Sequence, residues 1–455
     1  MEQFKRYRLP MLFCVILVLL ALIAGIAINL VSGIGSAAEH ISMGQRYLND
    51  LNYSEAILEF TNAIEMNPSS REARQGLSTA YMATGNYSFA ADVLEDVQDP
   101  YQPDEEISAS LANIYYQAKN YGKAIQIVSQ LIDLTDDDQY YEQRENLMRE
   151  WHSGARTWAA GTDQELSISN GNVTSRGHNT LGQLGTSNGL GDSEYEQTEF
   201  ASAQFPGTPH SVYCAGRTSY VLDGSGNLWA AGENRWGQMG DSYATTLPES
   251  GWIQLTTTGD VLDAAGAPGR MLVLRADCSL WEAGYGSSQT MSRVSSFDSV
   301  MKIDSYGQTL YVLTTDGSLY ASRSNGYSYY GDAGWMLVAD EVTDFQASDA
   351  GVIWLTSGNS IGSNFGMSAP EGWTPQEDGT VLPDLEVVSV ASDGSDTLLL
   401  CSDGSLYIYS AGGVTSAGNN GKVTDMYYAD SMLCVTLEDG STLGLQNGQL
   451  QPITG

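Results

Sequence analysis

Residues 398–406 read Leu-Leu-Leu-Cys-Ser-Asp-Gly-Ser-Leu and join an apolar strand to a tight turn, a pattern that recurs along the chain. Seven such turns occur, and they begin at Asn170, Ser225, Asp277, Asp316, Gly358, Asp403 and Asp439. The second turn position is Gly or Asn in six of them and Cys278 in the remaining one. Gly and Asn are favoured there because a tight hairpin turn needs a residue with positive φ. Each unit is too small to bury its own apolar face. The pattern therefore predicts an all-β, seven-bladed propeller over residues 156–455.

The first two of these units carry a longer motif. It reads RGHNTLGQLG at residues 176–185 and AGENRWGQMG at residues 231–240. Both stretches resemble the regulator-of-chromosome-condensation repeat, whose family has seven blades and docks partners on loop-built faces. The family's founding nucleotide-exchange role is not carried over, because this chain is strongly acidic and shows no GTPase-binding insertion. The final stretch, residues 445–453, is a candidate for the strand that closes blade one.

A second repeat precedes the propeller. The segments NYSEA, NYSFA and NYGKA are spaced by 34 residues and begin at Asn52, Asn86 and Asn120. This period resembles the tetratricopeptide repeat, which implies an all-α stack over residues 39–151, with three repeats and a capping helix at residues 139–151. The family's peptide-binding groove implies contacts at Asn49, Thr79, Asn113, Tyr116 and Gln117. A spacer or self-association role for the stack stays open as the alternative.

The N-terminus has the pattern of a membrane anchor. Residues 11–31 are almost entirely apolar and long enough to cross a bilayer. Basic residues flank the run only on its N-terminal side, at Lys5, Arg6 and Arg8. The positive-inside rule then places residues 1–10 in the cytoplasm and the remaining chain outside a bacterial cell membrane, as a single-pass envelope protein. A cleaved signal peptide, with Ser36-Ala37-Ala38 as its processing site, is the alternative. The expected fold class is thus multidomain: a transmembrane helix, a tetratricopeptide stack and a propeller.

The composition limits the function. Lys and Arg number 20 and Asp and Glu number 55, so the net charge is −35 and binding to nucleic acid is not expected. The four His residues are scattered, and no nucleophile elbow, phosphate loop or metal-ligand spacing occurs. We therefore expect no enzyme, with no catalytic, cofactor-binding or metal-binding residues. Among the cysteines, Cys401 and Cys434 lie in apolar strands and should be buried, whereas Cys278 in its turn should be exposed.

Aromatic residues near Gly- and Ser-rich connections are the best candidates for a binding surface, since Tyr and Trp often dominate interfaces. The predicted propeller contacts are Trp236, Tyr285, Tyr329, Tyr330 and Trp335. The sequence therefore predicts a non-catalytic, membrane-anchored extracytoplasmic scaffold that binds a protein. The alternative is a propeller that binds a glycan or the cell wall, and a third possibility is a hydrolytic or other enzyme with an axial active site. Two or more buried carboxylates in a central funnel would favour the enzyme. The sequence leaves the oligomeric state open.

Overall fold

The computed structural model describes residues 37–98, 103–240, 251–285, 290–323, 334–364, 386–410, 413–418, 421–429 and 431–453. The chain divides into two compact units, Met1–Ile114 and Tyr115–Gly455. The predicted basic flank and anchor, residues 1–31, lie outside the described residues. Within the described ranges, no helix is both long enough and apolar enough to span a membrane.

Paired helices build the first unit, as the 34-residue period predicts. Residues 37–49 are helical, and the elements that follow are α3 (Tyr53–Met66), α4 (Arg71–Ala83), α5 (Tyr87–Glu95) and the first part of α6 (Glu105–Gln117). Phe60 is fully buried and packs with Ala56, Leu77 and Ala80. A Cβ added at Gly76 would lie 2.4 Å from the Phe60 ring, so the glycine is what lets α4 approach α3.

The second unit starts at the end of α6 and includes α7 (Tyr121–Thr135) and α8 (Asp138–Trp151). The capping helix expected at residues 139–151 is thus present as α8. Both helices also pack on the propeller. Gln126 on α7 donates to the Val342 carbonyl oxygen, and a ring nitrogen of His152, just after α8, lies 2.9 Å from the Met301 carbonyl oxygen. The domain boundary that the sequence places at residues 151–156 therefore falls inside this unit, because α7 and α8 share their packing with the propeller.

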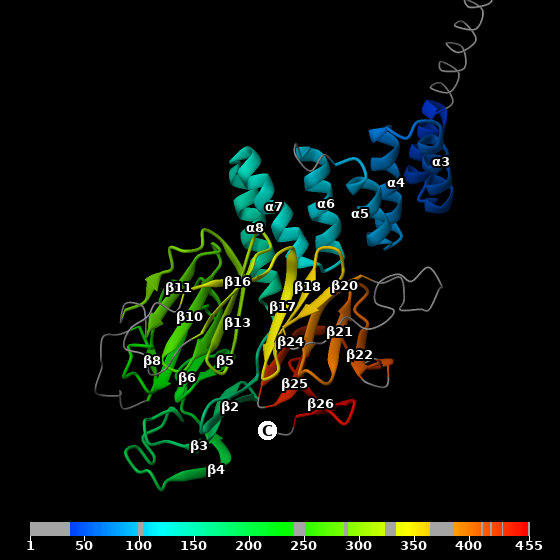
Figure 1. The fold of residues 1–455 in the computed structure, drawn as a ribbon. Coiled ribbons are helices and arrows are strands. Elements are labelled where there is room, and N and C mark those ends of the chain that lie inside the picture. Colours follow the sequence, from blue (N-terminus) through cyan, green and yellow to red (C-terminus); the bar gives the residue numbers. More distant parts are fainter. Residues whose placement is uncertain are drawn as a thin grey trace, which may run out of the picture. The chain divides into compact units, whose positions relative to one another are not determined.

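The propeller has seven sheets, each built from consecutive strands (Figure 1). Blades one to three contain β1 (Trp158–Ala160), β2 (Gln164–Ser169), β3 (Asn172–His178) and β4 (Glu196–Ser202); β5 (Pro209–Ala215), β6 (Thr218–Asp223), β7 (Leu228–Gly232) and β8 (Ile253–Gln254); and β9 (Val261–Ala267), β10 (Arg270–Arg275), β11 (Leu280–Gly284) and β12 (Ser292–Arg293).

Blades four and five contain β13 (Val300–Tyr306), β14 (Thr309–Thr314), β15 (Leu319–Arg323) and β16 (Met336–Ala339); and β17 (Val342–Ser348), β18 (Gly351–Thr356) and β19 (Ile361–Ser363). Blades six and seven contain β20 (Val387–Ser392), β21 (Thr397–Cys401), β22 (Leu406–Ser410) and β23 (Gly413–Ser416); and β24 (Val423–Ala429), β25 (Met432–Leu437), β26 (Thr442–Gln446) and β27 (Gln449–Pro452). Seven blades confirm the number that the repeated turn predicts.

The hairpin turns have the backbone that their sequence demands. The second position is left-handed in all seven, including Asn359 at φ 57° and Cys278 at φ 65°. The expectation that Cys278 is exposed is wrong, since only 1% of this residue is accessible. The Arg144 side chain of α8 lies near its thiol, and burial raises the thiol pKa. The helix that covers this hairpin is far from it in sequence, which is why the turn pattern alone misplaces the cysteine.

Side-chain contacts between the first and the last blade close the ring of the propeller. The candidate strand for closing blade one, β27, instead pairs with β26 and completes blade seven. Blade one meets blade seven through a hydrogen bond between the Thr157 and Thr442 hydroxyls and through a buried cluster of Trp158, Tyr427 and Cys434. The last blade is therefore self-contained, and the suggestion of a shared first blade is corrected.

Candidate functional site

The inner strands of the blades bring charged residues to one level of the propeller. In β9, β13, β17 and β24, the pairing with the following strand skips one residue after the first residue of the strand. The residue at which pairing resumes is charged in each of these four strands. These residues are Asp263, Lys302, Asp344 and Asp425. Three of them belong to a repeated Val-x-Asp pattern, which begins at Val261, Val342 and Val423. This pattern is a signal for the cluster that the sequence analysis missed.

Arg156, just before β1, is the central cation of this cluster. Its guanidinium lies 3.6 Å from an Asp304 oxygen and 3.7 Å from an Asp425 oxygen. Burial opposes the charged form of Arg156, but the carboxylates of Asp263, Asp304 and Asp425 outweigh it and raise the arginine pKa. Burial also raises the pKa of Asp425, although the positive charge of Arg156 works against this shift. Arg156 is therefore held as a cation among carboxylates, with 17% of its side chain exposed.

The carboxylates of Asp304 and Asp344 also accept hydrogen bonds from the next blade. Asp304 accepts a hydrogen bond from the Ala347 backbone N–H at 2.9 Å, and Asp344 accepts one from the Val390 N–H at 3.2 Å while it pairs with Lys302. Each of these bonds crosses from one blade to the next. Inner strands have unpaired backbone N–H groups at their free edge, and buried N–H groups need acceptors. These carboxylates therefore hold adjacent blades together.

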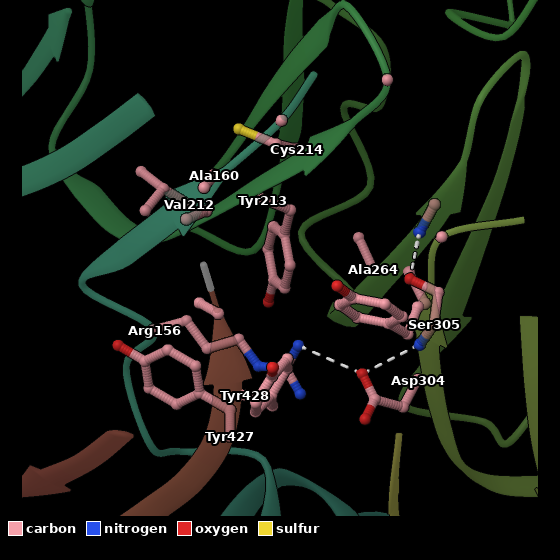
Figure 2. A pocket seen from close by; sticks show the side chains of 18 of the residues that line it. Arg156, Ala160, Val212, Tyr213, Cys214, Ala264, Asp304, Ser305, Tyr427 and Tyr428 are labelled. Atoms are coloured by element: carbon pink, nitrogen blue, oxygen red, sulfur yellow. Dashed lines mark hydrogen bonds and ion pairs between the residues drawn. The ribbon is translucent and has the colours of Figure 1, made fainter. Parts of the chain in front are cut away.

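A cavity of about 300 Å³ lies above Arg156 (Figure 2). It is lined by residues of blades one, two, three, four and seven. Figure 2 shows the Tyr213 side chain pointing toward Arg156, and the guanidinium stands 5.7 Å and 5.6 Å from the ring centroids of Tyr213 and Tyr427. Tyr306 and Tyr428 also line the cavity, with ring centroids 5.5 Å apart. The site is thus polar at Arg156 and aromatic along its walls.

The cavity presents one carboxylate, that of Asp304, among the described residues that line it. Asp263 and Asp425 act on Arg156 but do not belong to this lining. A hydrolase that uses paired carboxylates needs both to flank the substrate. The described parts of the chain also contain no group of three or more residues placed to hold a metal ion. The described lining thus offers hydrogen bonding and ring contacts.

The predicted aromatic surface is only partly brought together. Trp236 and Tyr285 meet edge to face, with ring centroids 5.3 Å apart, and both are half-buried. Trp335 has other ring partners: its ring lies 5.1 Å from that of Phe297 and near the Arg270 guanidinium. Tyr329 and Tyr330 lie outside the described residues.

An exposed apolar strip adjoins Trp335, and the sequence analysis did not identify it. Met336 is 71% exposed and Leu337 is 53% exposed. They are consecutive residues of β16, the outer strand of blade four, and pair there with Ala321 and Tyr320. We call Trp335, Met336 and Leu337 the blade-four strip. Met336 and Leu337 point to opposite faces of the sheet, and both are accessible because β16 is its edge strand.

The predicted groove residues divide between the two units. Asn49, Thr79 and Asn113 belong to the first unit and are exposed. Tyr116 and Gln117 belong to the second, where Gln117 is exposed and Tyr116 donates a hydrogen bond to Glu150 of α8 at 2.9 Å. This bond raises the Tyr116 pKa and commits its hydroxyl to helix packing.

Comparison with known proteins bears on both parts. Residues 50–114 match the tetratricopeptide repeat family. Among solved structures, human WBSCR16 is 15% identical, with a TM-score of 0.47, over 62% of this chain and 86% of that chain. Yeast RCC1 (Prp20), solved with Kap60, is 15% identical, with a TM-score of 0.38, over 66% of this chain and 74% of that chain.

For the helical part, YrrB, described as a tetratricopeptide protein with an unusual peptide-binding site, is 15% identical with a TM-score of 0.22. The similarity covers 24% of this chain and 57% of that chain. A search of curated proteins finds no match. The chain combines tetratricopeptide repeats, matched at residues 50–114, with a seven-bladed β-propeller.

Proposed function

We propose that this chain is a non-catalytic scaffold that binds a protein partner. The observation that carries the proposal is the blade-four strip, where Met336 and Leu337 expose 71% and 53% of their surface beside Trp335. Apolar side chains that face water gain free energy when a partner covers them. A partly buried Trp next to such residues is a suitable central anchor, since truncating an anchor of this kind typically costs about 2 kcal/mol of binding or more.

The partner should carry a basic surface around its apolar contact. The chain has a net charge of −35. Complementary charge accelerates association, and this effect weakens as salt screens it. The proposed partner is therefore a protein whose binding face has an apolar centre and Lys or Arg residues at its rim.

The helical repeats supply a second proposed surface. Within the first unit, neighbouring helices are linked by polar side chains: Gln45 donates to Glu72 at 2.9 Å, and Gln75 donates to Glu106 at 3.0 Å. Asn49 and Asn113 are exposed in the same unit. Side-chain amides can bind the backbone of an extended peptide, which supports these residues as peptide contacts.

Membrane anchoring and an extracytoplasmic location also belong to the proposal. They are supported by the apolar run at residues 11–31 and the basic residues before it. Protease added to intact cells should remove the propeller, while a tag placed before Met1 stays protected. A propeller that is cleaved only after lysis, although the purified protein is readily cleaved, would refute this orientation.

Site-specific photo-crosslinking tests the protein-binding role. A crosslinking residue replaces Leu337 in the full chain, and the matched control replaces Leu190, which is also exposed, at 48%, but lies in blade one. We expect position 337 to capture a discrete protein, position 190 not to capture it, and added salt to weaken the capture. Identical background labelling at both positions would contradict the proposed surface.

A further inference from the structure

Arg156 has hydrogen-bond donors that the described structure leaves unused. Its nearest carboxylate oxygens, on Asp304 and Asp425, are 3.6 Å and 3.7 Å away, which is longer than a hydrogen bond. No acceptor among the described residues lies within hydrogen-bond distance of its side chain. The guanidinium also forms part of the cavity lining. A partly buried guanidinium with unused N–H donors in a cavity lining is a recognition element for a ligand that supplies oxygen acceptors.

We propose that the axial cavity binds one ring of a neutral sugar, with hydroxyl groups bridging Arg156 and Asp304. A hydroxyl is the group that fits a donor and an acceptor standing 3.6 Å apart, because it can accept from the guanidinium and donate to the carboxylate at once. Figure 2 shows both side chains meeting at the same end of the cavity. This inference goes beyond protein binding at blade four and is tested separately from it.

The local charge selects a neutral ligand. Three carboxylates, those of Asp263, Asp304 and Asp425, act on the one guanidinium of Arg156. An anionic ligand would add negative charge where it is already in excess and buried. A cationic ligand would have to approach the guanidinium itself. Uncharged hydroxyl groups avoid both penalties while they satisfy the donors and acceptors.

The size and the walls of the cavity fit a sugar ring. Its volume of about 300 Å³ is the share of roughly ten water molecules in the liquid and lies at the lower end of ligand-pocket volumes. Tyr213 and Tyr427 flank the guanidinium, and Tyr306 and Tyr428 form another aromatic pair of the lining. Aromatic rings provide apolar faces for the C–H side of a sugar. Small residues such as Ala160 and Ala264 also belong to the lining.

Ligand-observed saturation-transfer NMR on the full chain in detergent provides the test. The neutral probes are glucose, galactose, mannose and N-acetylglucosamine, and the charged analogues are glucuronate and glucosamine. At least one neutral sugar should bind, with a dissociation constant on the order of 1 mM. Its charged analogues should bind at least about tenfold more weakly. Binding of none of the neutral sugars, or stronger binding of a charged analogue, would overturn the proposal.

Two variants locate the site. Arg156→Gln should weaken the binding of the neutral sugar at least about tenfold. Because that change could impair folding, Tyr306→Leu provides a second variant at a partly exposed lining residue, and we expect it to weaken binding severalfold. The matched control is Tyr141→Leu on α8, since Tyr141 is 42% exposed and Tyr306 is 36% exposed. Equal affinity in the parent, Tyr306→Leu and Tyr141→Leu proteins would place the sugar elsewhere and refute the axial site.

Discussion

Gln126 of α7 donates a hydrogen bond from Nε2 to the backbone carbonyl oxygen of Val342, at a distance of 2.7 Å. Val342 is the first residue of β17, the inner strand of blade five. The third helical repeat is therefore joined to the propeller by a side chain that satisfies a strand-end carbonyl. The helices α7 and α8 thus have two roles: they belong to the helical repeats, and they pack on the first residues of inner strands such as β13 and β17.

Gly122 tests how closely α7 must approach the propeller. A Cβ at this position would lie 1.9 Å from the Thr343 carbonyl oxygen, so Gly122→Ala forces the helix away from β17. We expect a loss of about 1–3 kcal/mol in the free energy of unfolding, as is typical of overpacking. Urea denaturation measures it. Gly334→Ala is the control, because a Cβ there meets no atom within 4 Å; equal stability of the two variants would contradict this packing.

Cysteine alkylation tests the cover that α8 provides. Cys214, Cys278 and Cys401 have free thiols, Cys434 is fully buried, and burial raises the thiol pKa of Cys214 and of Cys401 to about 12. All four should react slowly with iodoacetamide at pH 8 in the native protein. Arg144→Ala uncovers the Cys278 thiol but also removes a positive charge that lowers its pKa. We expect the gain in access to dominate, so that labelling of Cys278 accelerates selectively, as read by peptide mass spectrometry. Rapid labelling of Cys278 in the parent protein would show that α8 does not cover it.

His152 should make stability depend on pH. Burial lowers its pKa, although the Asp263 carboxylate partly offsets the shift, and Lys302 and Asp425 also face it. The unfolded chain therefore binds a proton near its ordinary pKa of about 6.5, where the folded chain does not. The stability that neutral His152 provides is complete above this pH and declines as the pH falls through it.

His152→Gln isolates this contribution. We expect the difference in unfolding free energy between the parent and the variant to shrink between pH 7.5 and pH 5.5. Asp425, whose pKa is raised, is present in both proteins and largely cancels in the comparison. A difference that stays constant or grows on acidification would show that His152 is not held neutral.

Asp304 should contribute to stability through two interactions. It accepts the Ala347 N–H of the next blade and lies beside Arg156. Asp304→Asn removes a buried negative charge next to this cation, and we expect a cost of about 1–3 kcal/mol, the range for a disrupted buried polar group. Asp403→Asn is the matched control, because Asp403 is exposed and accepts the Ser405 N–H within its own turn. Equal melting temperatures for the two variants would contradict an inter-blade role.

Local repeats were predictable from the sequence because they are encoded within short windows. A turn such as Asp403-Gly404-Ser405 needs a left-handed residue wherever it occurs, and the 34-residue period places Asn52, Asn86 and Asn120 at the starts of α3, α5 and α7. Both gave the correct type and number of elements. The covering of Cys278 and the pairing of β27 were not predictable in this way, since each depends on which distant segment packs there.

The axial cavity was missed for a related reason. Arg156, Asp304 and Tyr427 come from three separate blades, and no spacing in the sequence relates them. The Val-x-Asp pattern at Val261, Val342 and Val423 was visible, but its meaning depends on knowing that these residues begin inner strands. Among the predicted aromatic residues that the structure describes, Trp236 and Tyr285 are the two that make a ring contact.

The self-contained seventh blade has a consequence for how the ring could be rebuilt. Because β27 pairs with β26, each sheet formed by the described residues is encoded by consecutive strands of one stretch of chain. The covalent ends of the propeller meet at a seam held by Thr157, Trp158, Tyr427 and Thr442. A circular permutant that joins these ends and opens the chain between two other blades would keep all seven sheets whole. Gene rearrangement could therefore move the start of this propeller from blade to blade without splitting a sheet.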